Sequence, residues 1–326
     1  MRSKQVYAVF CLVCAVFGTT FLAIKVGVEA GAPSFLFAGL RFVAAGLILA
    51  ALVLVSGRAT PSSLAALAPR AVLLSLPYVV VNFGAMFWAE QYIDSSTAAQ
   101  LDTASPIAAA LLSALFLGKK LRPAHGLGVA AGFAGVWLVV RGAALASPLA
   151  LVPGAPGSKE VLASLVLVVG AIGFAGASVL YKRLFDDAVD SFSVNAINML
   201  SGGLILFGLA ALTGQREFPA SPAALGSLAY LVVVGSLVGH SANLWLVRKA
   251  GPIFTSSWTY VTPCIATAVG ALALGERVSA WSVAGAGLTL LGVWLITRGE
   301  MGGRARPVPA RVEAKAALVG DSVGGK

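Results

Sequence analysis

The sequence predicts an all-α integral membrane protein, with ten transmembrane helices arranged as two inverted five-helix repeats. Three observations predict this fold class. The composition is strongly apolar, the apolar residues gather in ten runs of membrane-spanning length, and the chain matches itself at an offset of 157 residues. The first two indicate a lipid environment, and the third indicates a duplication.

The composition lacks the polar surface that a soluble protein needs. Of the 326 residues, 58% are hydrophobic and 11% are charged, and the mean hydropathy is +0.90. Soluble globular domains carry about 25% charged residues. The composition therefore excludes a soluble enzyme, a disordered chain and a small disulfide scaffold.

The apolar residues form runs that are long enough to cross a bilayer as helices. A hydrocarbon core of roughly 30 Å needs about 20 apolar residues per helix. No run alternates with a period of two over a segment of ~10 residues, which excludes the strands of a membrane barrel. The predicted spans cover residues 6–26, 34–55, 71–91, 96–117, 124–141, 161–182, 191–213, 223–247, 253–274 and 280–298.

The basic residues predict the orientation of these spans. The chain carries 23 Lys and Arg against 13 Asp and Glu, a net charge of +10. With the N-terminus in the cytoplasm, most basic residues fall on the cytoplasmic side, as the positive-inside rule expects. Four fall outside: Arg141, Lys159, Arg216 and Arg277. We therefore predict a multi-pass protein of the inner or plasma membrane with both termini cytoplasmic, and no nucleic-acid partner.

The second half of the chain repeats the first. Residues that rarely match by chance in apolar helices recur 157 positions later: Phe17 and Phe174, Lys25 and Lys182, Trp88 and Trp245, Pro106 and Pro263. Because each copy holds an odd number of spans, the second copy must insert upside down. We expect a first five-helix repeat over residues 1–145, an inverted second repeat over 158–300, and a flexible basic cytoplasmic tail over 301–326. Inverted repeats are an architecture of secondary transporters, which bind their solute near the bilayer midplane.

Several motifs make the family recognisable. They are Phe17-Gly18-Thr19-Thr20-Phe21 before Lys25, Arg41-Phe42, Leu117-Gly118-Lys119-Lys120, Leu274-Gly275-Glu276-Arg277, Gly135-Val136-Trp137-Leu138 and Gly292-Val293-Trp294-Leu295. Over residues 6–299 the chain resembles EamA-type members of the drug/metabolite transporter superfamily. It departs from the family pattern at Phe17, where a Trp is usual, and at Gly118-Lys119, where Gly-Glu is usual.

This resemblance implies a ten-helix carrier that exports or exchanges small metabolites, often amino acids or related compounds. It also implies that spans three, four, eight and nine, with parts of one and six, line a central cavity. Spans five and ten would pack at the periphery or at a dimer contact.

The polar residues inside the spans are the candidates for binding a solute, because a polar group in a membrane usually faces the bundle interior or a watery cavity. Many gather before Pro106 and Pro263, each of which removes a helical hydrogen bond and would free a carbonyl, at Asp102 and Thr259 respectively. The predicted substrate-binding residues are Tyr78, Asn82, Gln100, Asp102, Thr103, His240, Asn243, Trp258 and Tyr260.

Three of the ionisable residues in the spans allow more than one role. Asp102 could bind a substrate amine, carry a proton, or be an interfacial carboxylate reached by water. His240 suits a proton-coupled step, because histidine titrates near pH 6.5, but it could equally be a hydrogen-bonded core residue. Arg41 could pair with Asp102 or extend towards the membrane surface.

No motif indicates an enzyme, and we expect no cofactor and no metal. Cys11-x-x-Cys14 lies in an apolar span without acidic or histidine partners. Gly128-x-x-x-Gly132 and Gly135 give span five a small-residue face, which favours close helix packing or a homodimer.

The sequence therefore favours a secondary transporter that acts on a small molecule, amino acid-like or amphipathic, by alternating access. A multidrug efflux carrier is the alternative within transport. A membrane-embedded lipid- or sugar-processing enzyme and a non-transporting scaffold are the alternatives outside it.

Overall fold

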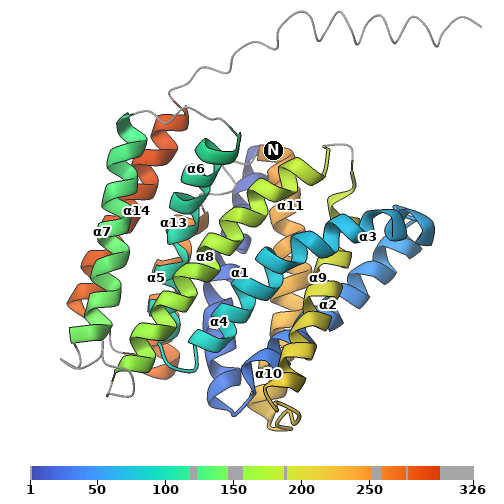
Figure 1. Ribbon diagram of the computed structural model, residues 1–326, viewed down its shortest axis with the longest axis horizontal. Helices are drawn as coiled ribbons and strands as arrows, with labels where there is room; N and C mark the ends of the chain where they lie inside the picture. The colour runs from blue at the N-terminus through green and yellow to red at the C-terminus, as the bar shows by residue number, and fades with distance from the viewer. Residues whose placement is uncertain are drawn as a thin grey trace, which may run out of the picture.

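A computed structural model describes residues 2–117, 123–145, 157–186, 189–250, 258–276 and 278–301, and within these ranges the regular structure is entirely helical (Figure 1). The first half contains α1 (Arg2–Glu29), α2 (Ser34–Val55), α3 (Pro61–Ser75), η1 (Leu76–Phe83), α4 (Gly84–Ala89), α5 (Ser95–Asp102), α6 (Ala104–Leu117) and α7 (Pro123–Leu145). The second half contains α8 (Ser158–Leu184), α9 (Ser191–Leu212), α10 (Pro222–Tyr230), η2 (Leu231–Gly239), α11 (His240–Ala250), α13 (Trp258–Leu274) and α14 (Ala280–Met301).

Seven helical stretches are long and apolar enough to cross a membrane, which confirms the all-helical membrane fold. They are Lys4–Glu29, Ser34–Val55, Pro61–Ala89, Ser95–Phe116, Ser158–Leu184, Ser191–Leu212 and Pro222–Asn243. The predicted spans 124–141, 253–274 and 280–298 correspond to three shorter apolar helices, Gly126–Val140, Val261–Leu274 and Ala280–Leu295. That all ten segments cross the membrane thus stays a prediction. The predicted tail beyond Met301 lies outside the described residues.

Large apolar side chains point outward along these helices, as a lipid-facing surface requires. Leu52 of α2 is 56% exposed, Leu204 of α9 is 55% exposed and Val169 of α8 is 56% exposed. Apolar area on this scale would favour aggregation in water. In a bilayer it contacts lipid chains.

The third and eighth predicted spans are each interrupted by a π-helical segment. Residues 71–91 run through α3, η1 and α4, and residues 223–247 run through α10, η2 and α11. The two π segments, 76–83 and 231–239, occupy nearly corresponding positions of the two halves. Segments of this kind are rare and are frequently found at functional sites.

The two matched prolines behave differently, against the expectation of a symmetric pair of interruptions. Helix α5 ends at Asp102, and α6 restarts at Ala104, so that Pro106 lies in its first turn. The missing N–H is tolerated there, because the first N–H groups of a helix have no intrahelical partner. Pro263 lies inside α13, which continues through it.

Helices α2 and α9 pack closely through glycines. A Cβ atom added at Gly46 would lie 2.6 Å from the backbone nitrogen of Leu200, and one added at Gly203 would lie 2.7 Å from that of Val43. Residue numbers therefore increase along one helix as they decrease along the other, so the two helices are antiparallel. The contact is also reciprocal, because Gly46 matches Gly203 and Val43 matches Leu200 at the offset of 157.

Helices α7 and α14 lie side by side at one edge of the bundle, on the left in Figure 1, and repeat this pattern. A Cβ atom at Gly135 would lie 2.5 Å from the nitrogen of Thr289, and one at Gly292 would lie 2.6 Å from that of Gly132. Gly135 matches Gly292, and Gly132 matches Thr289, so this antiparallel contact is reciprocal too. The small-residue face of the fifth predicted span is therefore covered by α14 of the same chain.

The turn between α4 and α5 is held by two charged residues from other helices. Lys25 of α1 donates to the carbonyl oxygens of Glu90 (3.1 Å) and Ile93 (3.0 Å), where α4 has just ended. Glu276, after α13, accepts from the backbone nitrogens of Ser95 (2.8 Å) and Ser96 (3.1 Å) at the start of α5. A cation at a helix C-terminus and an anion at a helix N-terminus are both stabilising. These contacts tie α1, α4, α5 and α13 together at one end of the bundle.

Candidate functional site

An interior cavity of about 80 Å³ lies between the two halves of the chain. A single water requires roughly 10–15 Å³ of such space, so the cavity holds more than one water-sized group. Side chains from α1, α2, η1, α4, α5, α8, α11 and α13 line it. They are Phe17, Thr20, Phe21, Arg41, Tyr78, Asn82, Phe83, Met86, Asp102, Phe174, His240, Asn243 and Trp258.

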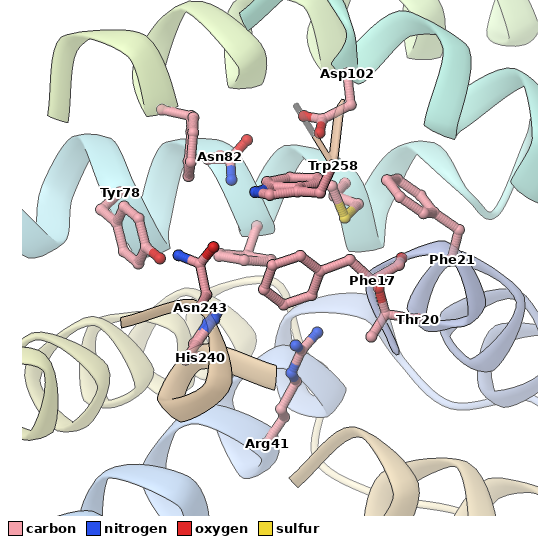
Figure 2. A pocket seen from close by; sticks show the side chains of 13 residues that line it. Phe17, Thr20, Phe21, Arg41, Tyr78, Asn82, Asp102, His240, Asn243 and Trp258 are labelled. Atoms are coloured by element: carbon pink, nitrogen blue, oxygen red, sulfur yellow. Dashed lines mark hydrogen bonds between the residues drawn. The ribbon is translucent and has the colours of Figure 1, made fainter. Parts of the chain in front are cut away.

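The cavity brings together most of the residues that the sequence predicts to bind a substrate, as Figure 2 shows. They are Tyr78, Asn82, Asp102, His240, Asn243 and Trp258. The π segments account for part of this placement, because Tyr78 and Asn82 lie in η1 and His240 follows η2 directly. Their role in binding stays a prediction.

The other predicted residues do not line this cavity where they are described. Gln100 and Thr103 are both buried on either side of the end of α5, and the Thr103 hydroxyl donates to the Gln100 carbonyl oxygen. Tyr260 lies in α13, and its side chain is outside those that the structure describes. Gln100 and Thr103 lie two residues and one residue from Asp102, and residues this close along a helix do not face the same side.

Two charged side chains of opposite sign line the cavity. In Figure 2, Asp102 enters from one side of the view and Arg41 from the other, with Phe17 and Trp258 drawn between them. Within the described part of the chain, no ion pair joins the two. The sequence hypothesis that Arg41 pairs with Asp102 therefore does not describe this conformation, and neither does extension of Arg41 to the surface, because Arg41 is only 2% exposed.

Several polar atoms of the cavity have no hydrogen-bond partner among the described residues. They are Nη1 of Arg41, Oδ1 of Asn82, Nε2 of His240 and Oδ1 of Asn243. Buried polar groups are nearly always hydrogen-bonded, and an unmade bond costs about 1–3 kcal/mol. This set of donors and acceptors can therefore bind water or the polar groups of a solute.

Aromatic rings form the remaining walls. Phe17 of α1 packs edge to face against Trp258, with ring centroids 4.7 Å apart, and against His240 at 5.6 Å. Tyr78 packs against Phe174 at 5.5 Å. The cavity is thus apolar on its walls and polar at a few fixed points, as small-molecule sites usually are.

The duplication contains a signal that points to lining residues which polarity alone misses. Three pairs of lining residues match at the offset of 157: Phe17 with Phe174, Phe83 with His240, and Met86 with Asn243. Residues close to an axis that relates two repeats meet their own counterparts, so matched positions that both lie at mid-span could have identified Phe83, Met86 and Phe174. In the second half, two apolar members of these pairs are replaced by His240 and Asn243.

The described residues hold no group of three or more His, Cys, Asp or Glu side chains placed to bind a metal ion. The three cysteines are free thiols, and Cys14 is the buried one. The arrangement of the cavity is suited to binding a small molecule by shape, charge and ring contacts.

Comparison with known proteins places the chain among membrane transporters. The model of the EamA-like transporter family matches residues 5–141 and again residues 161–298. The resemblance to the drug/metabolite transporter superfamily that the motifs indicate is thereby confirmed. Family and relatives are described as transporters rather than enzymes.

Two relatives cover nearly the whole chain. The "Uncharacterized inner membrane transporter YedA" of Escherichia coli (strain K12) is 30% identical, over 96% of this chain and 98% of the relative. The "Probable terminal-alkyne amino-acid exporter" of Streptantibioticus cattleyicolor is 28% identical, over 93% of this chain and 96% of the relative. A solved crystal structure shares the fold with a TM-score of 0.62 and 19% identity, over 90% of this chain and 98% of that one.

Proposed function

This chain belongs to the EamA-like transporter family, and we propose that it is a secondary transporter of the inner or plasma membrane, which exports or exchanges small amino acid-like or amphipathic metabolites by alternating access. The central cavity carries this proposal. Its lining comes from both halves of the chain, and it combines aromatic walls with polar atoms that lack partners. Such a site binds a solute between two bodies that can rock against each other.

We propose that the two halves are inverted repeats over residues 1–145 and 158–300. The reciprocal antiparallel contacts of α2 with α9 and of α7 with α14 support this relation, since a twofold axis passing between matched helices produces that register. The two separate matches to the family model also support it. In this topology both termini are cytoplasmic, as the distribution of basic residues favours.

The turn between α4 and α5 would close the cavity on the outer side. Lys25 and Glu276 join four helices there, and the bonds are short enough to fix the turn. Opening to the outside requires these contacts to separate, whereas the opposite end of the bundle would open to the cytoplasm. A homodimer would use a surface other than the glycine face of α7, which α14 covers.

An amino acid-like solute is supported by the two residues of opposite charge in the cavity, Arg41 and Asp102, and by the name of one relative, a terminal-alkyne amino-acid exporter. Asp102 could receive an ammonium group. Asp102 or His240 could instead carry a proton, which would couple export to the proton gradient.

Transport in proteoliposomes tests the proposal directly. Purified protein is reconstituted, loaded with unlabelled metabolite, and assayed for counterflow of the labelled compound, with and without a pH gradient. We expect counterflow of at least one amino acid-like compound, and Trp258→Ala should reduce it severalfold because Trp258 walls the cavity. Trp281→Ala is the matched control, because Trp281 of α14 is 45% exposed and lies outside the cavity lining. Absence of flux for every small metabolite would refute the proposal.

Multidrug efflux is the second candidate. The ring cluster around Phe17 and the acid Asp102 would suit a lipophilic cation, because such cations are attracted to aromatic faces and to carboxylates. Growth tests separate the two, since an amino acid carrier protects cells against toxic amino acid analogues alone, whereas a multidrug carrier protects them against toxic cations.

A further inference from the structure

Arg41 is a buried cation without an anionic partner. Its side chain rises from α2, where the residue is 2% exposed, and Nε donates to the Ser236 hydroxyl oxygen at 3.1 Å. Nη1 has no hydrogen-bond partner in the part of the chain that the structure describes. Among the described residues no carboxylate lies within ion-pair distance of the guanidinium.

Aromatic rings surround the guanidinium on its other sides. Its central carbon lies 4.9 Å from the ring centroid of Phe42, 5.2 Å from that of Phe83 and 5.8 Å from that of Phe87. Ring faces attract cations, but they do not accept the in-plane N–H bonds of a guanidinium as a carboxylate does. The rings hold the side chain in place and leave an N–H edge available on the cavity side (Figure 2).

An unpaired cation at this depth is costly. Charges inside a membrane protein are rare, and they mark substrate or ion pathways when they occur. A buried charge that lacks its partner is strongly destabilising relative to the paired state. An anionic solute that enters the cavity would remove this cost, so its affinity should exceed that of an uncharged solute of the same shape.

The lining residues also indicate which anion fits. Arg41 is the one Lys or Arg among them, and a single planar guanidinium matches one carboxylate by a bidentate pair. A doubly charged phosphate would need further cations, and the described lining residues supply none besides Arg41. The rings of Phe17, Phe21 and Trp258 suit an apolar body attached to the carboxylate.

We propose that Arg41 binds the carboxylate of the transported solute, and that this solute carries a single carboxylate on an apolar body. The inference rests on the proposed transport function and specifies the substrate class of the same cavity. It makes Arg41 a specificity-determining residue.

The test uses three probes that share one phenyl group: 3-phenylpropionate, its uncharged isostere 3-phenylpropionamide, and the cation phenethylamine. Binding to the purified full-length protein in detergent is measured by isothermal titration. We expect the wild type to bind 3-phenylpropionate at least about tenfold more tightly than the amide, since hydrogen bonds between charged groups are roughly twice as strong as those between neutral groups. This comparison needs no variant, so a folding defect cannot obscure it.

Variants then assign the preference to Arg41. Arg41→Gln should remove the preference for the carboxylate over the amide, and Arg41→Lys should restore part of it. Arg58→Gln is the matched control, because Arg58 also follows from α2 but its side chain is 49% exposed and outside the cavity lining. If Arg41 only packed between rings, Arg41→Gln would weaken all three probes alike or none.

The inference is overturned if the wild type binds the amide as tightly as the carboxylate, if it binds no carboxylate probe, or if Arg41→Gln keeps the preference. Counterflow distinguishes this failure from failure of the proposed function. Flux of phenethylamine without carboxylate binding would refute the role of Arg41 but would still support the proposed transport function. Carboxylate binding without flux of any solute would refute the transport function but would still support a carboxylate-binding site at Arg41.

Discussion

At the scale of single residues, the buried polar groups are of two kinds: some are hydrogen-bonded within the protein, and others line the cavity and can bind a ligand. Glu276 belongs to the first kind, because its carboxylate accepts three hydrogen bonds from Ser95 and Ser96. Asn82 belongs to the second, because its Oδ1 accepts none although the residue is 2% exposed. Substitutions at the two kinds of residue should therefore affect stability and transport differently.

Asn82→Ala should lower transport severalfold while changing the thermal stability of the protein little. The carbonyl oxygen that is removed makes no hydrogen bond in the protein, so its loss leaves no acceptor or donor newly unsatisfied. Counterflow and the melting temperature in detergent measure the two effects in the same preparation. A large drop in melting temperature with normal flux per folded molecule would contradict a binding role.

The carboxyl group of Asp94, in the turn between α4 and α5, should make the stability of the protein depend on pH. Burial, reinforced by the negative charge of Glu276 and opposed by Lys25, raises the pKa of the Asp94 carboxyl above its usual value. The folded chain thus holds this proton more tightly than the unfolded chain. The stability it contributes is present below the unfolded pKa of about 3.9, and is lost as the pH rises through the raised pKa.

Asp94→Asn should consequently melt at a higher temperature than the wild type at neutral pH and at the same temperature near pH 3.5. Melting curves across this range check the prediction. The control is Asp186→Asn, which replaces an exposed acid after α8. Its melting temperature should not diverge from that of the wild type as the pH rises. An Asp94→Asn curve that runs parallel to the wild type at all pH values would contradict it.

The types of residues in the spans predict part of the cavity from the sequence alone. The rest depends on the direction of each side chain, which the residue type does not determine. Tyr78 and Asn82 are four residues apart, so a regular helix already puts them on nearly the same face. Arg41 was ambiguous, because a long cationic side chain in a span can turn inward or reach the interface, and only the rings of Phe83 and Phe87 decide between these. Gln100 and Thr103 belong to the polar stretch before Pro106, but this stretch does not determine which of its side chains face the cavity, because residues one or two apart in a helix point in different directions.

At the scale of elements, glycines decide how closely the matched helices approach. Gly203 and Gly208 both lie in α9, but their surroundings differ. A Cβ atom at Gly203 would lie 2.7 Å from the backbone nitrogen of Val43, whereas nothing lies within 4 Å of one at Gly208. Backbone cannot move aside as a flexible side chain can.

Gly203→Ala should therefore destabilise the protein by a few kcal/mol, in the range of overpacked cores, about 1–3 kcal/mol. Gly208→Ala should stabilise it slightly, by up to about 1 kcal/mol, because alanine is the better helix former. Denaturation in detergent measures both variants. Equal effects of the two substitutions would show that the α2–α9 contact is looser than the structure indicates.

The bounds of the helices can be predicted from the sequence, but the π-helical segments cannot. Apolar length predicts that a span exists, and it placed α2 and α9 within one residue of their bounds. It does not predict η1 and η2, because a π turn differs from an α turn by one residue per hydrogen-bonded ring and leaves no mark in hydropathy. Tertiary packing must select it. The two segments lie where Tyr78, Asn82 and His240 face the cavity, which is the place where a change of helical phase alters the site.

At the scale of the whole molecule, the duplication organises both the packing and the cavity. The same offset that matches Trp88 with Trp245 relates the contacts of α2 with α9, those of α7 with α14, and three pairs of cavity residues. If a twofold axis that relates the two halves passes through the cavity, each half can close the cavity on one side of the membrane. The replacement of Phe83 and Met86 by His240 and Asn243 in the second half makes the two walls chemically unequal.

Inverted repeats predict that matched positions lie on opposite sides of the membrane. Ser63 at the start of α3 and Ala220 just before α10 match at the offset of 157, and both are exposed. Replacing the native Cys11, Cys14 and Cys264 by alanine allows Ser63→Cys and Ala220→Cys to be introduced one at a time. In intact cells, a membrane-impermeant thiol reagent should label Ala220→Cys at once and Ser63→Cys only after the membrane is permeabilised. Labelling of both from the same side would rule out inversion of the second repeat, and with it the orientation on which alternating access through the α4–α5 turn depends.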